Sequence, residues 1–275
     1  MTLKSKDSPF AGERIAKRLA RAGIASRRDA EKIILAGRVA IDGQVISSPA
    51  FNVGLDSAIT VDGKALVEAE PTRLWRYHKP KGLLTTHRDP EGRPTIFEHL
   101  PAGLPRVISV GRLDINSEGL LLLTNDGELA RRMELPATGW LRRYRVRIHG
   151  TISDSQITAL GNGIEVGGIH YGPIEATVDR SQGSNIWLTL GLREGKNREI
   201  RRVIEHLGGQ VTRLIRTAYG PFQLGMLPPS GVEEIPAKMM QQTFKEGPQK
   251  NAASGRTRSS SASKEAGHEN RRRKP

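Results

Sequence analysis

The chain has 275 residues and no cysteine; its length suffices for one large domain and a smaller one, and its composition excludes disulfides, thiolate metal sites and thiol nucleophiles. Its 43 Lys and Arg outnumber its 29 Asp and Glu, and the formal net charge of +14 favours a polyanionic partner such as nucleic acid. No stretch has the length and apolarity of a signal peptide or a membrane span, so we expect a soluble cytoplasmic protein without membrane contact.

Residues 12–66 are predicted to form a small α/β domain that starts with two helices. Small and apolar residues recur at helical spacing over residues 13–22, and the pattern stops at Gly23. The second helix is predicted to begin at Ser26, which is spaced to form a capping box with Asp29. A tight turn is therefore expected between the two helices.

Extended segments follow the helices. Asp42-Gly43 interrupts an alternating stretch and predicts a two-residue hairpin turn. Residues 67–72 contain a proline and show no periodicity, which is typical of a linker. The small domain is thus expected to end at residue 66.

Residues 73–240 are predicted to form an α+β domain with a mainly antiparallel mixed sheet. Strand patterns dominate this range, and helical patterns occur at 126–133, 153–160 and 197–207. Residues 241–275 contain nine Lys or Arg, three Glu and few apolar residues. Such a composition cannot offset the entropy of ordering the chain, so a disordered basic tail is predicted there.

Glycine-rich and histidine-containing stretches do not indicate a cofactor or a metal. "GLREGK" lacks Walker spacing and the Ser or Thr after its Lys, and "GNGIEVGG" does not join a strand to a helix as a dinucleotide loop must. The seven histidines include no pair at i, i+4 spacing. We therefore expect no cofactor and no metal ion.

Cations cluster along the first predicted helix and the segment after it. Such a face can be merely solvated, but few acids lie nearby in the sequence, and phosphate contact is the favoured interpretation. The residues of this cluster are Arg14, Lys17, Arg18, Arg21, Arg27, Arg28 and Arg38.

Asp114 lies in the segment "VGRLDINSEGLLLLTNDGELARRM", residues 110–133, where it precedes a turn and four leucines. An aspartate in this position can simply cap its own backbone, as is common in turns. Its alternative role is that of a reactive carboxylate. Residues near it in the sequence do not decide between the two.

Two further side chains are candidates for a site. Strand alternation in "RRYRVRIH" places Tyr144 on the face opposite the intervening arginines, where it could also be an ordinary core residue. In "REGKNREIRRVIEHLGG", Arg201 lies at the border of the apolar stripe of a predicted helix and can reach a cleft beside the core. The same helical spacing predicts that Arg198 and Arg202 point away from that stripe.

Together these segments resemble the RsuA/RluB-type ribosomal RNA pseudouridine synthases. The segment around Asp114 is similar to the catalytic motif of that family, and "YHKPKGLLTTHRDPEGRPTIFEHLP" is similar to the segment before it. "LREGKNREIRRVIEHLGGQVTRLIR" and "YGPFQLGMLP" resemble its C-terminal motifs, and "GIASRRDAEKIILAGRVAIDG" resembles its S4 RNA-binding module. The resemblance covers residues 12–236.

The resemblance implies a role for each candidate. Asp114 corresponds to the nucleophilic aspartate, Tyr144 to the active-site tyrosine and Arg201 to the basic partner that keeps the carboxylate ionised, with Lys196 as the alternative cation. Arg112 is expected to fill the space left by a flipped-out base. The residues expected to contact RNA are Arg14, Lys17, Arg18, Arg21, Ser26, Arg27, Arg28, Arg38, Arg112 and Lys196.

Two positions depart from the family pattern. Arg142 stands where a lysine is frequent, and His78 stands where an asparagine is more common. Both replacements keep a hydrogen-bonding side chain, so they bear on substrate choice more than on catalysis.

The implied activity is the site-specific isomerisation of uridine to pseudouridine in ribosomal RNA by a monomeric enzyme of ribosome biogenesis. The basic tail and the "QVTRLIRTAYGPF" segment are more similar to the large-subunit members. A non-catalytic ribosome-assembly factor with an S4 domain is the alternative, since it explains the charge equally well. An RNA methyltransferase is disfavoured because the sequence offers no nucleotide-binding loop.

Overall fold

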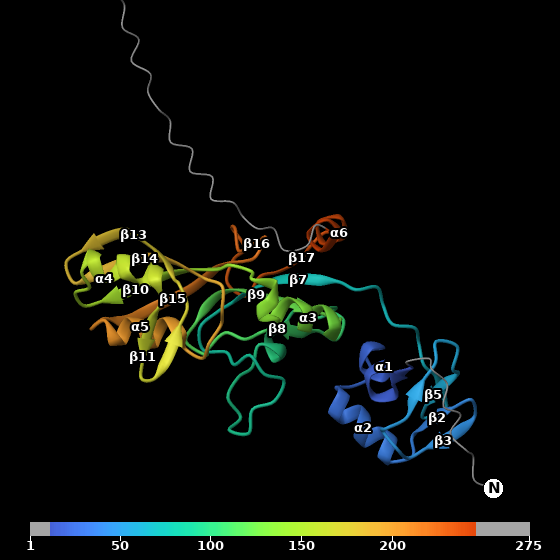
Figure 1. Ribbon diagram of the computed structural model, residues 1–275. Helices are drawn as coiled ribbons and strands as arrows, with labels where there is room; N and C mark the ends of the chain where they lie inside the picture. The colour runs from blue at the N-terminus through green and yellow to red at the C-terminus, as the bar shows by residue number, and fades with distance from the viewer. Residues whose placement is uncertain (1–11, 246–275) are drawn as a thin grey trace, which may run out of the picture.

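The computed structural model describes residues 12–245 and contains a small N-terminal unit and a larger unit built on one sheet (Figure 1). In the small unit, two helices pack beside a four-stranded antiparallel sheet in the order β3-β2-β5-β6, and a short β1-β4 pair lies beside them. The elements are β1 Glu13–Arg14, α1 Ile15–Arg21, α2 Arg27–Leu35, β2 Val39–Ile41, β3 Gln44–Ile46, β4 Asn52–Val53, β5 Ile59–Val61 and β6 Lys64–Ala65.

Local signals placed these elements correctly. The Ser26 hydroxyl accepts the backbone N–H of Asp29 at 3.1 Å and donates to the Asp29 carboxylate at 2.7 Å, so it caps α2 where the sequence predicted a helix start. Asp42 and Gly43 both have positive φ, 49° and 80°, as a two-residue turn of the hairpin type requires. The predicted turn is confirmed.

A nine-stranded sheet forms the larger unit. Its main order is β13-β14-β10-β15-β9-β7-β17; β8 and β16 pair at its sides, and every pairing is antiparallel except that of β9 with β15. The strands are β7 Leu74–Lys79, β8 Ile108–Val110, β9 Glu118–Thr124, β10 Arg142–His149, β13 Glu175–Gln182, β14 Asn185–Leu192, β15 Gln210–Tyr219, β16 Phe222–Gln223 and β17 Val232–Glu234. The predicted mainly antiparallel mixed sheet is confirmed.

The four leucines of β9 are buried on both faces of the sheet. Leu120 and Leu122 belong to one apolar cluster, which α3 (Gly127–Glu134) covers, whereas Leu121 and Leu123 belong to a second cluster on the other face. Strands buried on both faces read as continuous apolar runs, which explains the sequence. This burial anchors the end of the turn that carries Asp114.

A third cluster lies beneath the other half of the sheet. It is formed by the inward side chains of β10 and β14 together with α4 (Asp154–Ala159) and α5 (Glu199–His206). Ile200, Val203 and Ile204 of α5 are buried, as the predicted stripe requires, and Leu207 is partly buried against the same core. Figure 1 shows α5 beside β15.

Gly119 allows the single parallel contact of the sheet. It pairs with Arg216 and has φ of +101°, and a Cβ atom there would lie 2.3 Å from the carbonyl oxygen of Arg216. No side chain fits at that separation. The close approach brings β15 against the start of β9, next to Asp114.

Several elements were not predicted from the sequence. They include the hairpin of β11 (Ile164–Val166) and β12 (Ile169–Tyr171), the edge strand β17, and α6 (Ala237–Lys245). α6 corrects the predicted start of the disordered tail at residue 241, because Phe244 packs against the aromatic ring of Trp140 at a centroid distance of 5.8 Å. The rest of the predicted tail, residues 246–275, lies outside the described residues.

Within residues 12–245, no helix has both the length and the apolarity that a membrane crossing needs.

Candidate active site

A cavity of about 620 Å³ opens where β9, β10, β15 and the start of α5 meet, and Asp114 lies on its wall. Asp114 begins a turn in which its backbone carbonyl accepts the N–H of Ser117 at 2.9 Å. Its side chain, one-third exposed, makes no hydrogen bond with the described residues. The carboxylate therefore does not cap its own turn, unlike that of Asp126, which accepts two N–H groups at the start of α3.

Lys79 stabilises the turn that carries Asp114 by hydrogen bonds to backbone carbonyl groups. Its side chain is fully buried, and its Nζ donates to the carbonyls of Pro80 and Ser117, each at 3.0 Å, and to that of Ile115 at 3.4 Å. Burial lowers the pKa of Lys79 to about 8, against the opposing effect of the nearby Asp114 charge. Lys79 was not predicted as a site residue, since it ends a strand that also contains Arg76 and His78 and so does not stand out in the sequence as a lone charge.

Thr85 stabilises the residue that precedes Asp114. Its hydroxyl donates to the carbonyl of Leu113 at 2.9 Å, and the Leu113 N–H points back at it at 3.4 Å. The segment before the turn is thus tied to residue 85, and the segment after it to Lys79. Asp114 is presented on a rigid loop.

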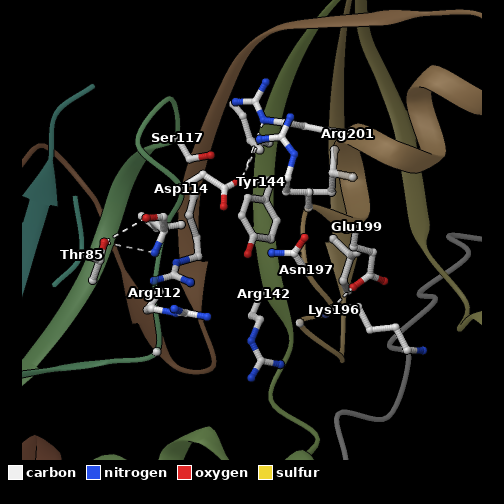
Figure 2. A pocket seen from close by; sticks show the side chains of 18 of the residues that line it. Thr85, Arg112, Asp114, Ser117, Arg142, Tyr144, Lys196, Asn197, Glu199 and Arg201 are labelled. Carbon is white, nitrogen blue, oxygen red and sulfur yellow. Dashed lines mark hydrogen bonds and ion pairs between the residues drawn. The ribbon is translucent and has the colours of Figure 1, made fainter. Parts of the chain in front are cut away.

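Two arginines flank the Asp114 carboxylate. Arg201 Nε lies 3.9 Å and Arg198 Nη1 lies 3.8 Å from Asp114 Oδ2 (Figure 2). The predicted approach of Arg201 is observed. The approach of Arg198 was not predicted: the sequence placed Arg198 only away from the apolar stripe, and as the N-cap of α5 with φ of 50° it does not follow helical spacing.

Arg201 is held in place by its other nitrogens. Nη2 donates to the carbonyl of Asn116 at 3.1 Å and Nη1 donates to that of Val211 at 3.3 Å. Its Nε is buried and has no hydrogen-bond partner among the described residues. Burial lowers the pKa of Arg201, with a smaller contribution from Arg198, while Asp114 opposes the shift.

Tyr144 comes from β10 and faces the same cavity. It is partly buried between two apolar clusters, and Figure 2 shows its ring beside the Asp114 carboxylate. Its strand neighbours alternate as predicted, since Val146 and Ile148 are buried while Arg145 and Arg147 are exposed. Tyr144 therefore both packs against the core and lines the cavity.

The floor of the cavity contains two buried arginines. Arg142 donates to the carbonyl of Arg193 at 2.9 Å and to the hydroxyl of Tyr219 at 3.1 Å. Arg216 donates its Nε to the carbonyl of Leu120 at 2.7 Å, while its Nη2 is buried without a partner among the described residues. Both add fixed positive charge beneath the space beside Asp114.

Lys196 does not approach Asp114. Its Nζ donates to Glu194 at 2.6 Å and to the carbonyl of His170 at 2.7 Å, and in Figure 2 it points away from the carboxylate. The prediction of Lys196 as the alternative cation is therefore wrong, and Arg198 occupies that position. Nearby, burial raises the pKa of Glu199 to about 7, with a smaller contribution from the charge of Glu194.

Arg112 lines the cavity with an exposed side chain and makes no ion pair with Asp114. Figure 2 shows it between Thr85 and Arg142, at the mouth of the space next to Asp114. This position leaves its guanidinium group available to an incoming ligand.

The cations of the small unit have different environments. Arg14, Arg21, Arg27 and Arg28 are exposed and make no ion pair within the part of the chain that the structure describes. Lys17 pairs with Glu13 and with Glu128 of α3, Arg18 lies 3.9 Å from Glu13, and Arg38 binds Asp62 through two hydrogen bonds of 2.6 and 2.7 Å.

These ion pairs change the predicted RNA-binding set. Arg38 is already neutralised by Asp62, and Ser26 uses its hydroxyl to cap α2, so both are less available to RNA than predicted. Lys17, Arg21 and Arg27 instead line a cavity of about 640 Å³ together with residues of the larger unit. The predicted basic face is thus directed partly toward that unit.

The arrangement suits reaction at an uncommitted carboxylate. The Asp114 oxygens have neighbouring positive charge but accept no hydrogen bond from the described residues, so they are free to bond with a substrate atom. An aromatic ring and several guanidinium groups surround the same space. These groups suit a planar base attached to a phosphate chain.

The chain is similar to known proteins in both units. Residues 73–206 match the family described as RNA pseudouridylate synthase, and residues 13–64 match the S4 domain. An uncharacterised RNA pseudouridine synthase of Rickettsia felis is 49% identical over 83% of this chain and 99% of its own length.

Two further relatives and one solved structure are similar to this chain. The ribosomal large subunit pseudouridine synthases B of Yersinia pestis and Haemophilus influenzae are 43% and 41% identical, over 82% and 85% of this chain and 74% and 68% of their own lengths. A crystal structure of a pseudouridylate synthase, 24% identical, covers 83% of this chain and 98% of its own with a TM-score of 0.58.

Proposed function

Because the chain belongs to the RNA pseudouridine synthase family, and is therefore an isomerase that converts uridine into pseudouridine in RNA, we propose that it modifies the ribosomal RNA of the large subunit. The names of the relatives from Yersinia pestis and Haemophilus influenzae support this substrate. We further propose that the enzyme works as a monomer in the cytoplasm, where it meets ribosomal RNA. Light scattering of the purified chain tests the monomer.

The proposed chemistry begins at Asp114. The reaction breaks the bond between ribose C1′ and uracil N1, turns the base, and joins C1′ to C5; C5 loses its proton and the freed N1 ends with one, so the product is an isomer of the substrate. Asp114 either attacks the sugar or the base as a nucleophile or assists formation of a glycal. Each route needs the ionised carboxylate, which neighbouring cations stabilise.

The observation that carries this proposal is the buried Nε of Arg201, which has no hydrogen-bond partner within residues 12–245 and lies 3.9 Å from Asp114 Oδ2. The anionic backbone of RNA disfavours a second anion in the same cleft, so a fixed cation at Asp114 offsets that repulsion. Arg198 contributes a second positive charge at 3.8 Å. Both cations place positive charge beside the carboxylate that reacts.

Tyr144 and Arg112 act on the base. A stacked uridine cannot reach a carboxylate on a cavity wall, so the target nucleotide is flipped into the cavity, at a cost of a few kcal/mol. Tyr144 stacks on the uracil and takes part in the transfer of the C5 proton. Arg112 at the mouth of the cavity fills the space that the base leaves.

The small unit positions the RNA. Its exposed and unneutralised cations, Arg14, Arg21, Arg27 and Arg28, contact phosphates, which gives affinity and orientation without reading sequence. Reversal of Arg27 and Arg28 to Glu should weaken binding and reduce its salt dependence. Turnover on saturating RNA should then persist.

Release of tritium from ribosomal RNA labelled at C5 of uridine tests the proposed function. Large-subunit RNA should release label and small-subunit RNA should not. Release from small-subunit RNA alone would contradict the proposal that large-subunit RNA is the substrate. Absence of release from both RNAs would favour a non-catalytic assembly factor. Mapping of the modified nucleotide then identifies the target uridine.

A further inference from the structure

The face of the large sheet that lies opposite the catalytic cavity is rich in arginine. On β10, Tyr144, Val146 and Ile148 point toward the core and the cavity, so the residues between them point outward. The outward residues of this half of the sheet include five exposed arginines and one tryptophan. We call this surface the arginine face: Arg143, Arg145, Arg147, Arg180, Arg213 and Trp187.

Strand register aligns four of these residues in one row. Trp187 on β14 pairs with Arg180 on β13 and with Arg147 on β10, and Arg147 pairs in turn with Arg213 on β15. Directly paired residues on one sheet face have Cβ atoms about 5 Å apart, so Trp187 lies between Arg180 and Arg147 in this row. The row crosses the strands from the edge of the sheet toward its centre.

A cavity of about 290 Å³ lies at this row. It is lined by Arg147, Arg180, Gln182, Asn185 and Trp187. Arg147 makes no ion pair with the described residues, and Arg180 donates only to the amide oxygen of Gln182, at 3.0 Å. The cavity thus combines two uncompensated cations, two amide side chains and an aromatic ring.

Asp179 and Glu118 pair with other arginines of the arginine face, not with Arg147 or Arg180. Asp179 lies 3.4 Å from Arg145 and accepts the hydroxyl of Thr189, and Glu118 accepts two hydrogen bonds from Arg213 at 3.0 and 3.1 Å. The positive charge of Arg147 and Arg180 therefore remains for a ligand. The guanidinium group of Arg145 lies over the Trp187 ring at 4.8 Å and helps to hold the indole in place.

We propose that the arginine face is a second RNA-binding site, which holds a single-stranded segment with its phosphates on Arg147 and Arg180 and a base against Trp187. Cations beside an aromatic ring are the usual means of binding single-stranded nucleic acid without sequence preference. The strands separate this site from Asp114, so it contacts RNA outside the target stem. The inference takes from the proposed function only that the ligand is RNA.

The test uses the full chain and a ten-nucleotide oligocytidine, which contains no uridine and forms no stem. Arg147→Glu with Arg180→Glu should lower its affinity at least tenfold. Removal of two phosphate contacts should also reduce the slope of log K against log salt by about 0.7 per contact. The matched control, Lys64→Glu with Lys238→Glu, reverses the same number of exposed charges elsewhere and should lower the affinity less than threefold.

Substitutions of Trp187 measure the contribution of base stacking to RNA affinity without changing the charge of the arginine face. Trp187→Ala should lower oligocytidine affinity about fivefold or more, because stacking of one base on an aromatic side chain is lost. Trp187→Phe should retain most of the affinity, and its thermal unfolding reports whether the sheet is intact. Equal losses in the arginine and control variants, no loss in Trp187→Ala, or equally tight binding of a ten-residue polyglutamate would overturn the proposal.

Tritium release from two RNA substrates distinguishes a failure of the second RNA-binding site from a failure of the proposed catalytic function. On a minimal target stem-loop, the arginine-face variants should retain the saturated rate of the unsubstituted enzyme, because none of their substitutions lies in the catalytic cavity. On a longer ribosomal RNA fragment with single-stranded flanks, they should require a higher RNA concentration. Loss of the saturated rate on the minimal stem-loop would show that the face supports catalysis, which contradicts a separate binding site.

Discussion

Arg201 Nε lies 3.9 Å from Oδ2 of Asp114, while Nη2 of the same guanidinium group donates to the carbonyl of Asn116, two residues further along the turn. One side chain thus both supplies charge to the carboxylate and fixes the loop that carries it. The two residues are 87 positions apart in the sequence. Their coupling depends on the pairing of β9 with β15.

Asp114→Asn should abolish pseudouridine formation, by at least a thousandfold in the single-turnover rate, and should leave RNA affinity within a few-fold. The amide keeps the shape of the side chain but cannot act as a nucleophile. Tritium release and filter binding measure the two quantities. Asp56→Asn, an exposed aspartate of the small unit, is the control and should retain full activity. Substantial turnover by Asp114→Asn would remove Asp114 from its proposed role.

Arg201→Ala should lower the saturated rate more than Arg198→Ala, although their charges lie at nearly equal distances from Asp114. Arg201 is mostly buried and also bonds to the Asn116 carbonyl, whereas Arg198 is half exposed and its charge is screened by solvent. We expect losses of about a hundredfold and tenfold. Arg202→Ala, on the exposed side of α5, should have no effect. A larger loss in Arg198→Ala would reverse the assigned order.

Lys79→Met should disturb the Asp114 turn. The substitution removes the donor shared by the carbonyl groups of Pro80, Ile115 and Ser117, of which the last is buried, at a cost of about 1–3 kcal/mol in the free energy of unfolding. The saturated rate should fall as well, because the turn is no longer held. Urea unfolding and tritium release on the same samples measure both effects. Lys81→Met, which alters an exposed lysine of the same segment, should leave both unchanged.

Glu199 should make the stability of the fold depend on pH. Because burial raises its pKa from 4.5 to about 7, the folded state binds more protons than the unfolded state between these values. The free energy of unfolding should therefore fall as the pH rises from about 4.5 to 7, by at most about 3 kcal/mol from this group.

Urea unfolding at several pH values between 5 and 8 measures this dependence. Glu199→Gln should reduce the decline, since the amide cannot ionise. Glu205→Gln, on the exposed side of the same helix, should preserve it. Identical pH profiles for the two variants would show that Glu199 does not hold the proton. The groups that face Glu199 are Glu194 and Lys196, and the Lys196 ion pair keeps the charge on Glu194.

Removal of the C-terminal residues should change only RNA affinity when it stops after Lys245, and should also lower stability when it includes the end of α6. Removal of residues 246–275, which contain eight Lys or Arg and three Glu, should lower the affinity for target and non-target RNA by a similar factor and reduce the salt dependence. Removal of residues 241–275 should in addition lower the melting temperature, because Phe244 leaves its contacts with Trp140 and Arg132. Equal melting temperatures of the two truncated chains would contradict the structural role of α6.

Local patterns in the sequence were sufficient for much of the fold. The Asp42-Gly43 turn, the Ser26 cap and the alternation around Tyr144 depend on backbone preferences and periodicities within a few residues, and each was predicted. The hairpin of β11 and β12, the edge strand β17 and α6 were missed, since these short segments take their stability from neighbours distant in the sequence.

The sequence by itself determined the fold class, the basic charge and the candidates Asp114, Tyr144 and Arg201. Only the tertiary structure decided that the second cation near the carboxylate is Arg198 and not Lys196. Arg198 approaches it because a left-handed backbone at the start of α5 turns that residue out of helical register, while Lys196 is held by Glu194 and the His170 carbonyl. Such contacts depend on strand pairings across about a hundred residues. Cations that look equivalent in the sequence therefore differ in the folded protein, because each has a different partner there.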